Sequence, residues 1–205
     1  MAICVEFTVA VYSDTMRPCV LPAQGRFEMH DKTRRAVMPS PTLYALCGRP
    51  FSGKTVLAER LRAGFGYPIV SVDEIKFAHG FPWIEDSPIT EAEWARIFGE
   101  SYDRTRALLR TGTSVIYDCA NLSRASRDAL RELAAEEGCS YRLVFVDISV
   151  DEARVRWRRN RDTRERFDLP ESLFEWALAA FERPLTDEHP VVYDPSADVA
   201  QVVEP

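Results

Sequence analysis

The chain has 205 residues, of which 46% are hydrophobic and 28% are charged, and its formal net charge is −6 at pH 7. These values are typical of one soluble globular domain that is large enough to bury a layered core. The acidic balance argues against broad, non-specific binding of nucleic acid, and no apolar run approaches the ~20 residues that a membrane span requires.

Residues 1–40 do not fit the pattern of the rest of the chain. Residues 3–12 read as one strand-like stretch, and residues 13–40 show no hydrophobic periodicity. Two interpretations are open: an added strand or arm, or a non-native extension from an over-long gene start. We favour the second, with Met38 as the true beginning, because residues 13–40 offer no face that a core would bury.

From Thr42 onward, short β-branched or aromatic runs alternate with helix-forming segments. This alternation predicts a three-layer α/β fold, in which helices cover both faces of a five-stranded, mainly parallel sheet. The expected strands are 42–47, 68–72, 113–117, 141–147 and 190–193, and the expected helices are 54–64, 90–110, 123–137, 150–162 and 170–182.

Helix-end signals support these boundaries. Thr90 with Glu93 forms a capping box, and Ser123 is a good N-cap. Gly112 and Gly138 supply the left-handed residue that follows a helix. We therefore expect one domain over 41–195, an N-terminal extension over 1–40 and a tail over 196–205, whose valines could pack as a short final element.

Residues 48–55 read GRPFSGKT, a complete G-x-x-x-x-G-K-[ST] phosphate-binding loop between an expected strand and an expected helix. The glycines let successive N–H groups face phosphate oxygens, and the helix N-terminus adds partial positive charge. The lysine of this motif reaches the β- and γ-phosphates, and the hydroxyl ligates Mg²⁺. With this motif, the expected three-layer fold is that of the P-loop NTPases. The sequence thus predicts ATP and Mg²⁺ as cofactors, bound by Gly48, Ser52, Gly53, Lys54, Thr55 and Val56.

Two acids end the neighbouring strands, at the edge where parallel sheets bind ligands. Asp118 ends an apolar strand and is placed to complete the Mg²⁺ shell with Thr55, although it could instead cap the next helix. Asp73 has three open roles: a second metal-shell acid, a strand-end cap, or the base that accepts a proton from a substrate hydroxyl. We favour the base. The aromatic loop 76–89 beside Asp73 is expected to shape the substrate pocket.

Residues 154–166 contain seven arginines. We expect that nearby acidic residues do not balance their positive charge. Planar arginine forks suit the clamping of phosphates, so this segment is expected to be a mobile lid over the γ-phosphate. The alternative is a solvated basic helix.

Together, GRPFSGKT, VSVDEI, VIYDCANLSRASR, RWRRNR and DLPESLFEWALAAFERP resemble the small P-loop kinases of the AAA_33, zeta-toxin-like and polynucleotide 5′-kinase-like group over about residues 42–185. The resemblance implies catalytic roles for Lys54, Asp73, Arg159 and Arg164. It also implies substrate contacts from Asp73, Asp118, Asn121 and Arg127. Cys119-Ala120 and Arg49-Pro50-Phe51 depart from the family pattern.

The expected function is therefore transfer of the γ-phosphate of ATP to a hydroxyl of a small-molecule acceptor. A polynucleotide 5′-hydroxyl kinase is the runner-up, which the acidic balance disfavours, and an ATP-binding regulatory protein without an acceptor is the third possibility. Nucleic acid is thus the less favoured partner. Five scattered cysteines without C-x-x-C spacing suit a reducing compartment, and we expect a cytoplasmic protein without membrane association.

Overall fold

A computed structural model of the chain describes residues 40–81, 89–165, 168–194 and 198–203. Residues 1–39, where the sequence predicts an extension, lie outside the described part, and so does the expected start at Met38. No helix in the described ranges is long and apolar enough to cross a membrane.

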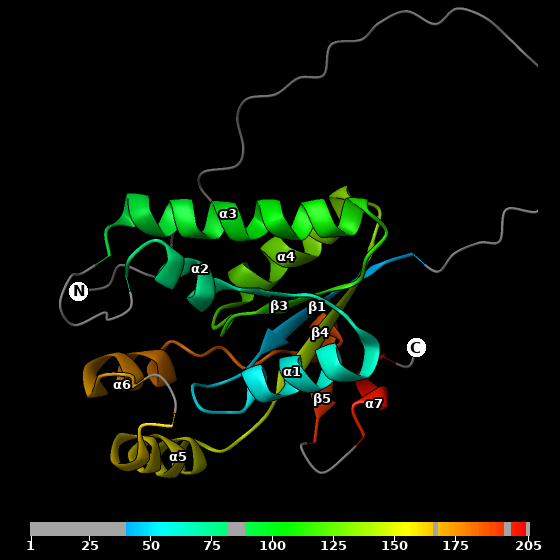
Figure 1. Cartoon of the computed structure of the whole chain (residues 1–205). Helices are drawn as coiled ribbons and strands as arrows, with labels where there is room; N and C mark the ends of the chain where they lie inside the picture. Colours follow the sequence, from blue (N-terminus) through cyan, green and yellow to red (C-terminus); the bar gives the residue numbers. More distant parts are fainter. Residues whose placement is uncertain (1–39, 82–88, 166–167, 195–197, 204–205) are drawn as a thin grey trace, which may run out of the picture.

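The described residues form one five-stranded sheet in which every strand pair is parallel, as the sequence predicts. The strand order is β2-β3-β1-β4-β5, so β1 lies at the centre and the loop after it leaves from the middle of the carboxyl edge (Figure 1). The strands are β1 (Thr42–Cys47), β2 (Ile69–Ser71), β3 (Val115–Asp118), β4 (Ser140–Val146) and β5 (Val191–Tyr193).

Helices cover both faces of this sheet, which confirms the three-layer prediction. In Figure 1, α2, α3 and α4 lie on one face, α1 and α7 lie on the other, and α5 and α6 lie together at one end. The helices are α1 (Lys54–Phe65), α2 (Val72–Ala78), α3 (Glu91–Arg110), α4 (Arg124–Glu136), α5 (Val150–Thr163), α6 (Glu171–Ala179) and α7 (Ala200–Val203), and Thr186–Glu188 form the 3₁₀ turn η1.

The central strand shows why two helical layers are needed. Successive side chains of a strand point to opposite faces. Leu43 and Ala45 enter the core beneath α2, α3 and α4, whereas Tyr44 and Leu46 enter the core shared with α1 and α7. All four side chains are at most 3% exposed, so β1 is buried on both faces and its end is fixed in position.

The local helix signals are confirmed. The Thr90–Glu93 capping box is formed in both directions, and the Ser123 hydroxyl accepts from the N–H of Ser126. Gly112 and Gly138 have φ of 79° and 66°, as expected after a helix.

One element differs from the expectation. The loop expected from residue 76 begins inside helix α2, whose N-cap is Ser71, and residues 82–88 of that loop lie outside the described part. The strand expected over 68–72 included Val72, which is the first residue of α2, whereas β2 ends at Ser71. At the other end of the chain, Val202 of α7 is fully buried, so the final valines do pack as a short element.

Candidate active site

The loop over 48–55 is shaped by two glycines. A Cβ on Gly48 would meet the Val146 carbonyl oxygen at 2.6 Å and the Ser52 Oγ at 2.9 Å, so a side chain there would force the loop off β4. Gly53 has a φ of 105°, in the left-handed region, and forms the N-cap of α1. The glycine spacing of the motif is therefore required by this backbone path.

The first turn of α1 is suited to an anion. The N-cap of α1 is Gly53, which has no side chain to bond the first N–H groups, and the first turn contains no acidic residue. The first N–H groups of a helix have no partner within the helix, and the helix dipole makes this end partially positive. Phosphate oxygens are the natural partners of such an end.

Lys54 lies inside the curl of the loop. Its Nζ donates to the carbonyl oxygens of Gly48 and Arg49 at 2.9 and 2.8 Å. Burial lowers the pKa of Lys54, and the nearby Asp118 opposes that shift. The ammonium is thus positioned by backbone oxygens at the place where a bound triphosphate would be.

Asp118, the last residue of β3, lies beside Thr55 in the first turn of α1. Burial raises the pKa of the Asp118 carboxyl, while Lys54 and a hydrogen bond with the Thr55 hydroxyl act in the opposite direction. A carboxylate and a hydroxyl are the hard oxygen ligands that Mg²⁺ takes beside substrate phosphates. The described residues hold no group of three or more His, Cys, Asp or Glu side chains suited to a metal.

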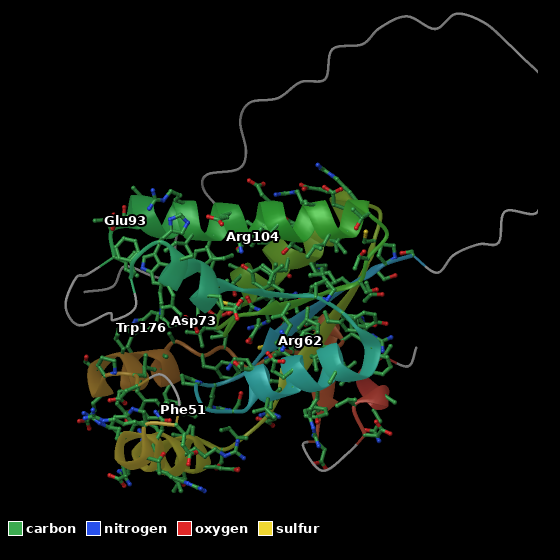
Figure 2. All side chains as sticks on the ribbon, viewed as in Figure 1. Phe51, Arg62, Asp73, Glu93, Arg104 and Trp176 are labelled. Carbon is green, nitrogen blue, oxygen red and sulfur yellow. The ribbon has the colours of Figure 1, made fainter. Side chains whose placement is uncertain are left out.

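Asp73 lies in the first turn of α2, directly after β2, and its side chain is 72% exposed. Its Oδ1 accepts from Lys76 Nζ at 3.0 Å. It also interacts electrostatically with Lys54 and Asp118 across the carboxyl edge of the sheet. In Figure 2, Asp73 lies on the side of the molecule that also carries Phe51 and Trp176.

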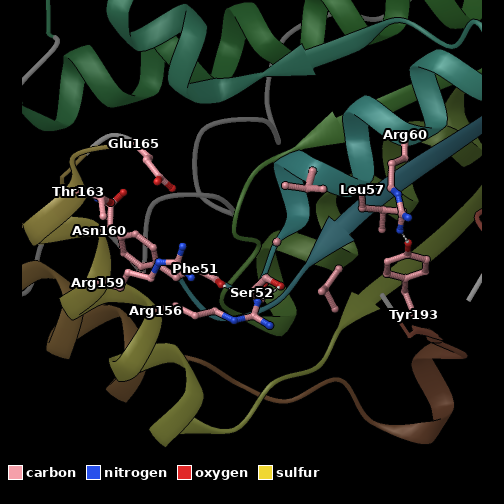
Figure 3. Close-up of a pocket in the computed structure, with 13 residues that line it drawn as sticks. Phe51, Ser52, Leu57, Arg60, Arg156, Arg159, Asn160, Thr163, Glu165 and Tyr193 are labelled. Atoms are coloured by element: carbon pink, nitrogen blue, oxygen red, sulfur yellow. Dashed lines mark hydrogen bonds between the residues drawn. The ribbon is translucent and has the colours of Figure 1, made fainter. Parts of the chain in front are cut away.

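A pocket of about 350 Å³ opens beside the phosphate loop. Figure 3 shows it between the loop, α1, α5 and the end of β5. One end is lined by Ser52 and Gly53, and at the other end Arg60 donates to the Tyr193 hydroxyl at 2.6 Å. The pocket thus extends from the phosphate loop along α1 to the end of β5.

The arginine-rich segment forms helix α5, and of the two arginines that the resemblance singles out, Arg159 lines the pocket and Arg164 does not. Arg156, which the sequence reasoning missed, donates to the carbonyl oxygens of Phe51 and Ser52 at 3.2 and 3.0 Å and lines the pocket with Arg159. Arg164 is exposed, forms the left-handed C-cap of α5, and is not among the residues that line the pocket. Arg156 lies three residues before Arg159, and residues at this spacing share one side of a helix, so the sequence could have indicated Arg156 as well.

The expectation that these arginines lack local compensation is wrong for three of the seven. Arg154 is paired with Glu175 of α6, Arg156 with Glu152, and Arg161 with Asp168. The helix is also anchored by the buried Trp157, which stacks on Phe174 of α6 at 4.8 Å between ring centroids. Arg166 lies outside the described residues.

The unusual Phe51 inside the loop has a packing partner. Its ring meets Phe174 edge-on at 6.0 Å, and its backbone is left-handed with a φ of 61°. Left-handed backbone is strained for a bulky residue, so the contact with Phe174 must offset that strain. Phe51 therefore fastens the phosphate loop to the α5–α6 pair.

The structure corrects the substrate roles expected for Asn121 and Arg127. Asn121 is buried and its amide donates to the Leu46 carbonyl at 2.7 Å. Arg127 is 2% exposed and pairs in a two-point fork with Glu188 at 2.6 and 3.0 Å. Its remaining nitrogen donates to the carbonyl oxygens of Asn121, Leu122 and Glu182. Both side chains are therefore bonded within the protein and tie the loop after β3 to its surroundings.

Comparison with known proteins connects this site to a family. The family model AAA_33, described as an AAA domain, matches residues 43–184 of the chain. A search of the curated proteins finds no match.

Solved structures of kinases are similar in fold. A sugar kinase from Janibacter sp. is 23% identical, covers 80% of this chain and 91% of its own, and has a TM-score of 0.59. A gluconokinase from Sinorhizobium meliloti is 24% identical, with 81% and 89% covered and a TM-score of 0.56. Kti12 from Chaetomium thermophilum, solved with ADP-AlF3, is 21% identical, with 78% and 93% covered and a TM-score of 0.64. The fold is thus that of the P-loop kinases.

Proposed function

The chain belongs to the AAA_33 family, and we propose that it is an ATP-dependent kinase that transfers the γ-phosphate to a hydroxyl of a small-molecule acceptor. In this reaction, the acceptor oxygen forms a bond to the γ-phosphorus while the bond to the bridging oxygen of ADP breaks. The proton of the acceptor hydroxyl passes to Asp73.

The observation that carries this proposal is the grouping of three charged side chains at the carboxyl ends of three neighbouring strands. Lys54 follows β1, Asp118 ends β3 and Asp73 follows β2, and they interact electrostatically with one another. A protein that only binds nucleotide needs the first two groups. An exposed carboxylate beyond them supports chemistry on an acceptor.

Thr55 and Asp118 would hold Mg²⁺, which when bound neutralises charge on the phosphate oxygens. Lys54 adds positive charge at the same phosphates, and the first N–H groups of α1 orient them. Arg156 and Arg159 line the pocket from α5 and would contact the phosphates from the opposite side.

A polar, hydroxyl-rich acceptor is favoured by two observations. The similar folds include a sugar kinase and a gluconokinase. The net charge of −6 disfavours a long polyanionic acceptor such as a nucleic acid.

The test is a screen for transfer of labelled γ-phosphate from ATP with Mg²⁺. The probes are D-gluconate, D-glucose, D-ribose, adenosine and an oligonucleotide with a 5′-hydroxyl. We expect labelling of a small molecule. Labelling of the oligonucleotide alone would replace the proposal by its polynucleotide alternative, and tight ATP binding without any transfer would favour a regulatory protein.

Three variants assign the roles. Asp73→Asn should lower turnover by about 10²–10⁴-fold with nearly unchanged nucleotide affinity, which is the range for loss of a general base. Asp118→Asn should instead weaken binding of ATP and raise the Mg²⁺ concentration needed for activity. Glu74→Gln, a matched exposed acid next to Asp73, should behave as the parent. Equal loss of nucleotide binding in both aspartate variants would show that these roles are wrongly assigned.

A further inference from the structure

Lys76 of α2 is a lysine in the core. Its side chain is 2% exposed, whereas the Asp73 carboxylate that it pairs with at 3.0 Å is 72% exposed. Lysine is almost never fully buried unless it is paired. The ion pair therefore joins a fixed, buried cation to an anion that faces the solvent at the active site.

Burying an ammonium is costly, and a pair with an exposed carboxylate three residues away on the helix offsets only part of that cost. Val72 and Ile75 of the same helix are also buried, so Lys76 shares its side of α2 with apolar residues.

The geometry indicates control over the Asp73 side chain. An exposed aspartate samples several rotamers, and catalysis loses about 10²-fold when a group is misplaced by ~1 Å. The ammonium is held by burial and lies 4.8 Å from the centre of the Phe77 ring. Because Lys76 binds Oδ1, the other carboxylate oxygen is left to accept a proton.

We propose that Lys76 is a positioning residue, which orients the Asp73 carboxylate toward the acceptor hydroxyl through this ion pair. The inference rests on the proposed role of Asp73 as the base. Lys76 belongs to the same helix as Asp73 and its side chain is buried, so we place it behind the carboxylate and assign it no contact with the substrate.

The test is a double-mutant cycle with Lys76→Met and Asp73→Asn. Turnover is followed as ADP release from Mg²⁺-ATP, with the acceptor that the screen returns and, in parallel, with water alone. Lys76→Met should lower kcat by about 10–10²-fold. It should leave the KM values for ATP and acceptor within about twofold. In the Asp73→Asn background the same change should have less than a twofold effect, because residues that act through one another are not additive.

Two further variants keep the result interpretable. Arg104→Met removes the pair with Glu100 on α3, an ion pair at helical spacing away from the site, and should leave kcat unchanged. If Lys76→Met does not fold, Lys76→Gln keeps a donor without the charge and takes its place in the cycle.

The outcomes separate the inference from the proposed function. Additive losses, or a raised KM for the acceptor with unchanged kcat, would overturn the positioning role and leave the kinase proposal intact. Parent-like turnover of Asp73→Asn would overturn both.

Discussion

Replacing Arg127 by Met is the sharpest test of how this site is built. The resemblance to known kinases predicts that Arg127 contacts substrate, whereas the structure buries it against Glu188. The two readings predict opposite results. A substrate-contacting residue would alter acceptor KM and leave stability intact, and a buried structural residue would do the reverse.

The expected magnitude follows from the burial of the pair. The Arg127 and Glu188 side chains are 2% and 4% exposed, so removal of the guanidinium leaves a carboxylate in the interior without its partner. Breaking a buried pair in this way costs about 3–5 kcal/mol. In a domain of this size, 1 kcal/mol shifts Tm by about 2–4 °C, so Tm should fall by about 6–20 °C.

The assay is thermal unfolding followed by circular dichroism at pH 7, with two controls. Arg124→Met removes a more exposed pair with Asp187 and should cost no more than ~1 kcal/mol. Adding Glu188→Gln to Arg127→Met should recover part of the loss, because it removes the unpaired charge. A parent-like Tm for Arg127→Met together with a raised acceptor KM would refute the structural role.

The pH dependence gives an independent check on the same pair. Burial raises the pKa of Glu188, but the hydrogen bonds from Arg127 and from the Leu185 N–H, together with the charges of Arg127 and Arg124, hold that pKa below its usual value. A carboxyl with a lowered pKa contributes stability that is present above its unfolded pKa and is lost as the pH falls through the folded one. The stability difference between parent and Arg127→Met should therefore be full at pH 7 and shrink below about pH 4.

Three other changes give clear expectations. Lys54→Ala should lower turnover by at least ~10²-fold, measured as γ-phosphate transfer, because it removes charge from the developing transition state; undiminished turnover would reject the kinase proposal. Arg159→Lys keeps the charge but loses the planar guanidinium at the pocket, so kcat should fall more than ATP affinity. Arg164 is exposed, so Arg164→Lys should match the parent. If both variants had the kinetics of the parent, these arginines would form a solvated surface without a role in the transfer. A chain that starts at Met38 should keep its melting temperature within ~5 °C and its activity, and a larger drop would mean that the preceding residues belong to the fold.

The sequence alone determined the features that act over a few residues. The glycines of the phosphate loop, the Thr90 capping box and the left-handed Gly112 each depend on backbone geometry within one turn, so they could be assigned without knowing the fold. The alternation of strands and helices likewise follows from local hydrophobic patterns and predicts a parallel sheet. The positions of Lys54, Thr55 and Asp118 follow from these local rules, because each lies at the end of a predictable strand or the start of a predictable helix.

Tertiary structure decided which charged residues face the site and which are buried. Arg127 meets Glu188, 61 positions later in the chain, and Arg156 meets the loop carbonyl of Phe51, 105 positions earlier. Whether an arginine binds a ligand or a buried carboxylate depends on such distant partners, because the guanidinium donates equally well to both. Lys76 shows the same dependence within one short helix: a lysine is usually exposed, and the tertiary structure buries this one, whereas Asp73 three residues earlier stays exposed.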